Sequence, residues 1–333
     1  MQRITLPNTG LTISRLGFGC ASLTAHNDRS KAISVLNAAH ELGVTHFDTA
    51  RLYGMGQSES ILGEFLQGKR DRVTVTTKFG LEAAGPLASN NKLISFAKNV
   101  VRRSSFLKKL ARKGGAGAVS SGKFTPEDAQ RSLDTSLREL KTDHVDLFML
   151  HCCTLVDACK EDLIAFLQTQ VSKGTIRAFG PSTEYEKING KASAFPAAHS
   201  LFQFESNTAT RNLDSFRAAE VAGAGARDVI TFAPIYAAKE LALAAAANKV
   251  QMRNLSEFAQ QASIDAANPD AIAREMLADA LRRNARGGVL FASTSVARIK
   301  ANIDDAFKPR TTEQQTAFAN LIEVLKPLVK PKV

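Results

Sequence analysis

The sequence predicts an α/β fold in which eight parallel strands close into a (β/α)8 barrel, the TIM-barrel fold, and three observations support this. Eight short runs rich in Val, Ile, Phe and Thr recur along the chain and are nearly continuous in apolarity, as strands buried on both faces are. Segments with helical periodicity separate them. The 333 residues are 44% hydrophobic and 23% charged, which suits a globular chain of this size. An open doubly wound sheet is the competing architecture.

The predicted helices carry signals at their ends. The helix predicted over 30–42 stops before Gly43, a residue suited to the left-handed position after a helix. Thr125 and Pro126 supply a capping hydroxyl and a first-turn proline to the next long helix. The predicted strands are RLGFG from residue 15, THFDTA from 45, RVTVTTKFG from 72, HVDLFMLH from 144, TIRAFGPST from 175, SLFQFESN from 200, DVITFAPI from 228 and GGVLFAST from 287.

We expect the chain, 1–333, to form a single barrel with a basic insertion over 83–124, after the third strand. The formal net charge is +11, and no Asp or Glu occurs from 83 to 126. That stretch holds nine Lys and Arg residues, so the remaining residues are close to neutral. A charge confined to one segment argues against a nucleic-acid-binding protein.

The insertion has three possible roles. Apolar residues at roughly helical spacing face a basic side, and a Gly-, Ala- and Ser-rich stretch follows over 114–122. A lid over the active face, a solvated helix without a special role, and a membrane-surface or nucleic-acid contact are the alternatives. The apolar positions are Ile94, Ala97, Val101, Leu107 and Leu110.

Several classes of site are not expected. The start of the chain lacks the apolar run of a signal peptide, and no apolar stretch is long enough to cross a bilayer, so we expect a cytoplasmic protein without a transmembrane segment. The four cysteines form no C-x-x-C pair, and the histidines show no H-x-x-x-H spacing, so no metal site is predicted.

A G-x-G pair, Gly17 and Gly19, resembles a dinucleotide-binding fingerprint only in part. Ser22 stands where the third glycine belongs, and no helix opens directly after the pair. We interpret these glycines as a tight strand end at the mouth of the barrel.

Four polar residues fall where predicted strands end, which is where barrel enzymes place their chemistry. They are Asp48, Tyr53, Lys78 and His151. A phenol has a pKa of about 10, and a neighbouring cation lowers it, so Lys78 held by Asp48 is expected to lower the pKa of Tyr53. Tyr53 could then give a proton to a carbonyl oxygen that His151 orients, with an external hydride completing the reaction. A structural ion pair and a core histidine are the alternative interpretations.

The sequence resembles the aldo-keto reductase superfamily over nearly its whole length. The combination FDTA…Y…G.SE.ILG with a downstream TK and LH carries the resemblance. Other matching segments are RLGFGCASL, VTVTTKFG, SLRELKTDHVDLFMLH, KGTIRAFGPST and FASTSVARIKANI. The resemblance implies a (β/α)8 barrel that binds NADP or NAD without a Rossmann domain, and a catalytic tetrad at the four residues named above.

The resemblance also implies contacts to the nicotinamide. Ser182 and Thr183 stand where the family has Ser-Asn, and they would hold the carboxamide together with Gln203. Phe232 occupies the position of a ring that stacks on the nicotinamide.

At the adenosine end, the resemblance implies contacts from Ser293, Thr294, Arg298 and Asn302. One common version of this motif has a lysine before the serine, where this chain has Ala292. Because Arg298 remains available for a bidentate phosphate contact, NADP(H) is favoured over NAD(H).

The substrate is expected to be a small carbonyl compound or a sugar, and the direction of the reaction and the oligomeric state stay open. Cys20, Leu52, Phe79 and Cys152 are expected at its pocket wall by position alone. The leading hypothesis is an NADP-dependent oxidoreductase that interconverts a carbonyl and an alcohol. The alternatives are a cofactor-sensing regulatory barrel of the same fold and a different barrel enzyme, such as a phosphate-sugar isomerase.

Overall fold

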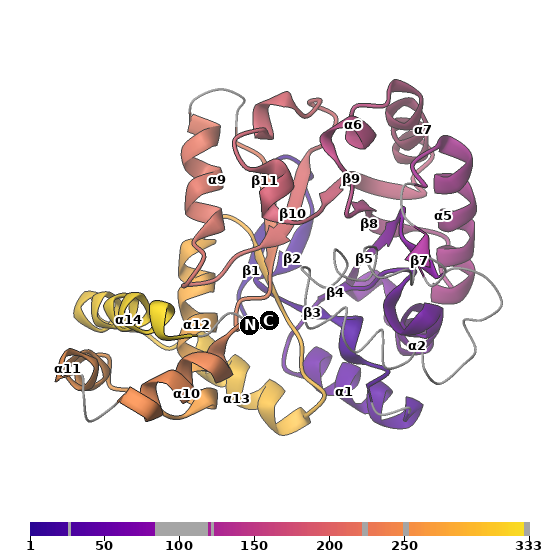
Figure 1. Ribbon diagram of the computed structural model, residues 1–333. Coiled ribbons are helices and arrows are strands. Elements are labelled where there is room, and N and C mark those ends of the chain that lie inside the picture. The colour runs from indigo at the N-terminus through magenta and orange to yellow at the C-terminus, as the bar shows by residue number, and fades with distance from the viewer. Residues whose placement is uncertain (26–27, 84–118, 121–122, 222–225, 249–252, 330–333) are drawn as a thin grey trace.

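In the computed structural model, eight parallel strands close into a barrel surrounded by helices, which confirms the predicted (β/α)8 class (Figure 1). Each of the eight predicted runs contains one barrel strand. The strands are β3 (Leu16–Gly19), β4 (His46–Asp48), β5 (Thr74–Phe79), β8 (Val145–His151), β9 (Ile176–Ser182), β10 (Leu201–Glu205), β11 (Asp228–Phe232) and β12 (Gly288–Phe291). They pair in sequence order, and β12 pairs with β3 to close the ring.

The structure describes residues 1–25, 28–83, 119–120, 123–221, 226–248 and 253–329. The helices within these ranges are α1 (Arg29–Glu41), α2 (Gln57–Leu66), α5 (Pro126–Leu140), α6 (Leu155–Ala158), α7 (Glu161–Ser172), α8 (Tyr185–Ile188), α9 (Asn212–Val221), α10 (Ala238–Asn248), α11 (Arg253–Gln261), α12 (Pro269–Arg283), α13 (Val296–Ala306) and α14 (Thr312–Leu325). No helix in the described part of the chain is both long and apolar enough to span a bilayer.

The helix ends follow the sequence signals. The Asp28 carboxylate caps α1 by accepting the backbone N–H of Lys31 at 2.9 Å, and Gly43 beyond the helix has a φ of +92°. The Thr125 hydroxyl accepts the backbone N–H of Asp128 at 3.2 Å and caps α5. Side-chain capping therefore fixes where these helices start.

Alternation along each strand separates two cores. On β8, Phe148 packs in the core between strands and helices, whereas Leu147 and Met149 belong to a second cluster inside the barrel. On β5, Val75 and Phe79 face the outer core. Lys78, one residue before Phe79, is therefore directed into the barrel.

A hairpin closes the amino-terminal end of the barrel, and the sequence did not predict it. Strands β1 (Arg3–Thr5) and β2 (Thr12–Ser14) pair antiparallel. The backbone N–H groups of Asn8 and Thr9 donate to the carboxylate of Asp228, the first residue of β11. The apolar residues of this hairpin join the cluster inside the barrel. Only the opposite end, where barrel sites lie, is left for chemistry.

A short ladder joins the start of the basic insertion to a segment near its end. Strand β6 (Glu82–Ala83) pairs antiparallel with β7 (Val119–Ser120), so these two segments lie side by side. The predicted amphipathic helix, on which the three alternative roles of the insertion depend, falls within 84–118, and the segment after it extends over 121–122; both ranges lie outside the described residues.

Helices α10, α11 and α14 pack together at one side of the barrel with a small apolar core of their own (Figure 1).

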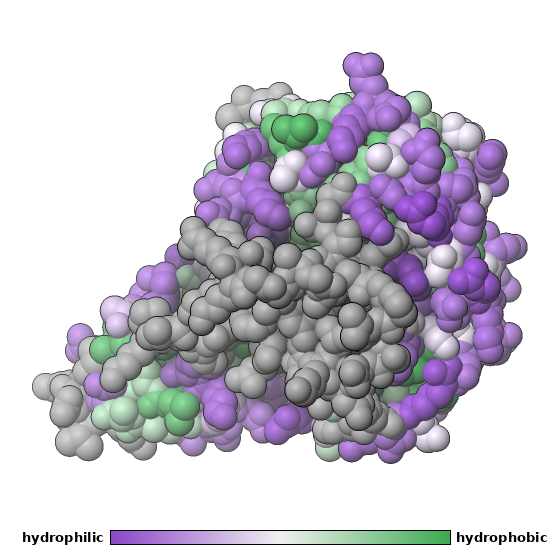
Figure 2. All heavy atoms as spheres, turned by 45° about the vertical axis from the view of Figure 1, so that its right-hand side comes forward, coloured by the Kyte–Doolittle hydropathy of each residue, from purple (hydrophilic) through white to green (hydrophobic). Residues whose placement is uncertain are grey.

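Hydrophilic residues cover most of the coloured surface in Figure 2, and apolar residues form smaller areas on it.

Gly17 lies within β3 and serves packing inside the barrel. A Cβ there would lie 2.7 Å from Leu290 Cδ2 and 2.8 Å from His46 Cδ2, and Thr74 holds the His46 ring by a hydrogen bond. A Cβ at Gly19 would make only ordinary contacts, beginning at 3.6 Å.

Gly17→Ala is expected to lower the free energy of unfolding by about 1–3 kcal/mol, because the added methyl group overpacks the barrel interior. Gly19→Ala, two residues further along the same strand, is the matched control and should cost less. Urea denaturation followed by circular dichroism measures both. Equal losses in the two variants would refute the packing role.

Candidate active site

The structure brings all four predicted catalytic residues together at the open end of the barrel. Asp48 ends β4, Lys78 is the penultimate residue of β5, His151 ends β8, and Tyr53 opens a short 3-10 helix after β4. The Lys78 ammonium lies 2.5 Å from Asp48 Oδ1 and 3.5 Å from the Tyr53 hydroxyl. It also donates to the carbonyl of Thr49 at 3.0 Å. Lys78 is thus the centre of the site.

The His151 ring contacts the Tyr53 ring. The two rings meet edge to face, with centroids 5.9 Å apart. The Nδ1 atom of His151 is buried and makes no hydrogen bond within the described part of the chain. The imidazole therefore retains hydrogen-bonding capacity that the described residues do not use.

A chain of hydrogen bonds joins two predicted cofactor residues to the tetrad. The Ser182 hydroxyl donates to Gln203 Oε1 at 2.5 Å, and Gln203 Nε2 donates to Asp48 Oδ2 at 2.7 Å. Lys78 binds the other carboxylate oxygen of Asp48, so both oxygens of this buried acid are engaged. Buried charges require such partners.

The pKa of Tyr53 differs from the expectation. Burial raises the pKa of the Tyr53 hydroxyl, and the opposing effect of Lys78 does not compensate, so the predicted net lowering is wrong. Burial by itself lowers the pKa of Lys78, but Asp48 and Tyr53 together outweigh burial, and the net direction of the pKa is upward. At neutral pH the phenol therefore keeps its proton beside an ammonium cation.

His151 is neutral in this setting. Burial, followed by the charges of Lys78 and Lys187, lowers its pKa to about 3. Lys187 lies near because its ammonium donates to the carbonyl of Cys152 at 3.0 Å. A neutral imidazole offers one N–H donor and one acceptor.

A buried acid that the sequence analysis did not single out holds the segment that carries Tyr53. Glu59 of α2 is fully buried, and its carboxylate binds Arg51 at 2.5 Å. The hydroxyl of Thr77, which precedes Lys78, donates to the same carboxylate at 2.6 Å. Glu59 therefore ties the segment after β4 to β5. Its signal in the sequence was an acid two residues before the apolar pair Ile61 and Leu62 of the predicted helix.

Two of the four residues expected at the substrate wall do not reach the mouth. Cys20 and Phe79 have no exposed surface and lie in the outer core, where Phe79 stacks on Phe148. Phe79 follows the inward Lys78, so strand alternation turns it outward.

The other two wall residues adjoin the tetrad in sequence. Leu52, which is buried, immediately precedes Tyr53. Cys152 is partly exposed, and its N–H donates to the carbonyl of Ser182 at 2.7 Å. Burial raises the pKa of the Cys152 thiol to about 11, so it is not a thiolate nucleophile.

Of the remaining predicted nicotinamide contacts, Phe232 ends β11 and is partly exposed at the open end of the barrel. Thr183 is buried, and its hydroxyl donates to the carbonyl of Cys153 at 3.0 Å. The Thr183 hydroxyl is therefore occupied by the protein.

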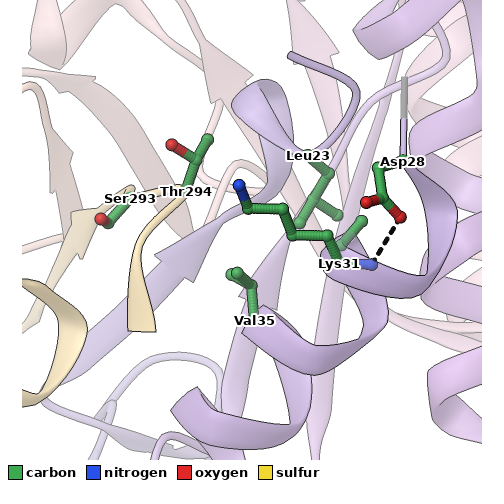
Figure 3. Close-up of a pocket in the computed structure, with 7 residues that line it drawn as sticks. Leu23, Asp28, Lys31, Val35, Ser293 and Thr294 are labelled. Atoms are coloured by element: carbon green, nitrogen blue, oxygen red, sulfur yellow. Dashed lines mark hydrogen bonds between the residues drawn. The ribbon is translucent and has the colours of Figure 1, made fainter. Parts of the chain in front are cut away.

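The predicted adenosine contacts divide into two groups. Ser293 and Thr294 line a pocket between the start of α13 and helix α1 (Figure 3). Arg298 is instead 70% exposed, with Nε 4.0 Å from the carboxylate of Asp270, and it does not line this pocket. Asn302 is partly buried on α13. The pocket is lined by Leu23, Asp28, Lys31, Ala32, Val35, Ser293 and Thr294.

Comparisons with known proteins identify the family of this chain. The family described as the aldo/keto reductase family matches residues 15–323, and the chain belongs to this family of oxidoreductases. An uncharacterized oxidoreductase, YqkF, from Bacillus subtilis (strain 168) is 27% identical over 325 residues, covering 95% of this chain and 94% of the relative. The aldo-keto reductase AKR11C1 from Bacillus halodurans has a similar fold, with a TM-score of 0.68, 20% identity, and coverage of 100% of this chain and 98% of that chain.

Arg51→Ala is expected to lower the free energy of unfolding by about 3 kcal/mol, because it leaves the buried Glu59 carboxylate without its cation. Arg29→Ala is the matched control: it removes a guanidinium from Glu64 in an ion pair whose side chains are 42% and 37% exposed, and it should cost much less stability than Arg51→Ala. Urea denaturation measures both. A small loss for Arg51→Ala would show that Glu59 does not depend on this partner.

Proposed function

We propose that this protein is an NADP(H)-dependent oxidoreductase that interconverts a carbonyl group of an aldehyde, ketone or sugar and an alcohol, with Tyr53 as proton donor and acceptor. The observation that carries the proposal is the position of the Tyr53 hydroxyl, within 3.5 Å of the Lys78 ammonium and beside the His151 ring. The complete tetrad favours turnover over a regulatory barrel that only senses the cofactor.

The residues at the mouth fit a nicotinamide. Gln203 and Ser182 present an amide and a hydroxyl that are already oriented by their mutual hydrogen bond, and Phe232 presents a partly exposed ring. An amide, a hydroxyl and an aromatic face suit a planar carboxamide-bearing ring. When bound there, the cofactor would supply or accept the hydride.

In the reducing direction, Tyr53 gives its proton to the carbonyl oxygen and becomes a phenolate. Lys78 then lies beside a full negative charge, which it stabilises more strongly than the neutral phenol. Asp48 keeps the Lys78 ammonium in place, and the neutral His151 donates a hydrogen bond that orients the substrate oxygen. In the oxidising direction the phenolate of Tyr53 accepts the proton from the alcohol.

The preference for NADP(H) over NAD(H) is part of the proposal. The names of similar proteins mention both cofactors. One similar structure, an aldo-keto reductase from Klebsiella pneumoniae, is in complex with NADPH, with a TM-score of 0.64, 18% identity, and coverage of 97% of this chain and 96% of that chain. An NADH-specific methylglyoxal reductase from Escherichia coli (strain K12) is 30% identical over 191 residues, which cover 54% of this chain and 51% of the relative. The preference must therefore come from residues of this chain.

Tyr53→Phe is expected to lower kcat for carbonyl reduction by about 100-fold to 10,000-fold, because the phenol is the proposed general acid. NADPH binding, followed by fluorescence titration, should remain close to wild type. A variant that still reduces carbonyls at the wild-type rate would eliminate Tyr53 as the proton donor. Wild-type protein that binds no nicotinamide would instead favour a different barrel enzyme.

The pH profile of kcat/KM for reduction is expected to be flat between about pH 5 and 9. His151, with a pKa of about 3, stays neutral above this value, and Tyr53, with a pKa above its ordinary value, stays protonated through this range. The oxidation rate should instead rise with pH, because it requires the phenolate. Steady-state kinetics in both directions tests this. An inflection near pH 6.5 that His151→Asn removes would contradict it.

A further inference from the structure

We propose that Ser58 and Glu59, two fully buried polar residues in the first turn of α2, are positioning residues that set the distance between the Tyr53 hydroxyl and the Lys78 ammonium. This inference rests on the proposed function, in which Tyr53 is the proton donor. Both residues act through the segments that they hold.

Glu59 binds one residue from each of the two segments that carry the reacting pair. One carboxylate oxygen lies 2.5 Å from the guanidinium of Arg51, which stands two residues before Tyr53. The other oxygen accepts the hydroxyl of Thr77 at 2.6 Å, and Thr77 immediately precedes Lys78. Because a carboxylate is a rigid group, these two bonds fix how far the segment of Tyr53 stands from β5.

Strand alternation lets Glu59 act on Lys78 from outside the barrel. Val75 and Phe79 belong to the core between strands and helices, so Thr77 between them also points outward, whereas Lys78 points inward. Thr77 has no exposed surface, so water does not replace its bond to Glu59. A change at the outward hydroxyl therefore reaches the inward ammonium through one peptide unit.

Ser58 holds a further partner of Lys78 in place. Its hydroxyl donates to the carbonyl of Cys20, directly after β3, at 3.1 Å and lies 3.0 Å from the hydroxyl of Thr49. The carbonyl of the same Thr49 accepts the Lys78 ammonium at 3.0 Å. Ser58 thus anchors to the end of β3 the residue whose carbonyl binds Lys78.

A close contact confines the chain on the other side of Tyr53. Gly54 has a φ of +57°, and a Cβ at this position would lie 2.5 Å from Cγ2 of Thr24. The backbone that follows Tyr53 therefore packs directly against the segment after β3. With Arg51 held by Glu59 before it, Tyr53 is fixed from both directions along the chain.

The geometry of the reacting pair leaves little tolerance. The Tyr53 hydroxyl and the Lys78 ammonium are 3.5 Å apart, which is at the long limit of a hydrogen bond. A further separation of about 1 Å would break this contact, and misplacements of that size cost on the order of 100-fold in rate. The bonds made by Ser58 and Glu59 are therefore expected to matter for turnover as well as for stability.

The test measures steady-state carbonyl reduction by Thr77→Val, Ser58→Ala and Arg51→Ala in the full-length protein. Each variant is expected to lower kcat about 10-fold to 100-fold, because Tyr53 or Lys78 moves out of position. KM and the dissociation constant for NADPH should change less than about threefold, because binding groups are untouched. Thr77→Ser keeps the hydroxyl and should restore most of kcat.

Two matched controls carry the same substitutions at the amino-terminal end of the barrel. Thr74→Val removes a hydroxyl that lies 2.9 Å from His46 Nδ1 on the same strand as Thr77. Arg70→Ala removes a guanidinium 2.8 Å from Asp146, whose side chain is 1% exposed. Both should lower the midpoint of urea denaturation, as the test variants do, and keep kcat within about twofold of wild type.

Crystal structures of the variants supply a measurement that needs no turnover. Thr77→Val and Arg51→Ala should place the Tyr53 hydroxyl more than 3.5 Å from Lys78 Nζ, and the two controls should not. An unchanged distance, a wild-type kcat in Thr77→Val and Ser58→Ala, or an equal fall of kcat in the controls would overturn the inference while leaving an oxidoreductase. Wild-type protein that turns over neither carbonyls nor alcohols would instead overturn the proposed function.

Discussion

The ion pair between Asp48 and Lys78 is the constraint on which the rest of the site depends. Removing two opposite charges from water costs several kcal/mol per ion unless the surroundings supply further polar partners. Here Lys78 has the Thr49 carbonyl and the Tyr53 hydroxyl in addition to Asp48, and Gln203 donates to the second oxygen of Asp48. The hydrogen bonds that this ion pair requires therefore hold β4, β5, β10 and the segment that carries Tyr53 in fixed positions relative to one another.

The same pair explains why a tyrosine whose pKa is raised suits the proposed reaction. In the resting site burial dominates, so Tyr53 holds its proton and is ready to act as an acid. Lys78 gains most from its position when the phenolate forms, because the attraction between opposite charges is strong where water is scarce. An interaction that is stronger in the transition state than in the resting enzyme accelerates the reaction, whereas one of equal strength in both states does not.

Much of the fold and the tetrad could be predicted from the sequence, because both depend on short-range patterns. Continuous apolar runs marked every barrel strand, and polar residues at the strand ends marked Asp48, Lys78 and His151. Phe79 was placed on the wrong side because nearness to a strand end was considered without the alternation that turns it outward. The direction of the Tyr53 pKa was missed because burial cannot be estimated before the packing is known.

Short-range sequence patterns do not predict contacts between distant segments. The hairpin of β1 and β2 is anchored by Asp228, and the cluster of α10, α11 and α14 is held by side-by-side packing rather than by any local motif.

Barrel closure joins parts of the chain that no local pattern relates. Lys31 and Ser293 come from opposite ends of the chain, yet they border one pocket because the first and last barrel strands are partners. A sequence motif can mark the segment after β12 or the helix after β3, but each motif describes its own segment alone. The composition of a pocket between them is therefore decided by the closed ring, and it can be read only once the ring is known.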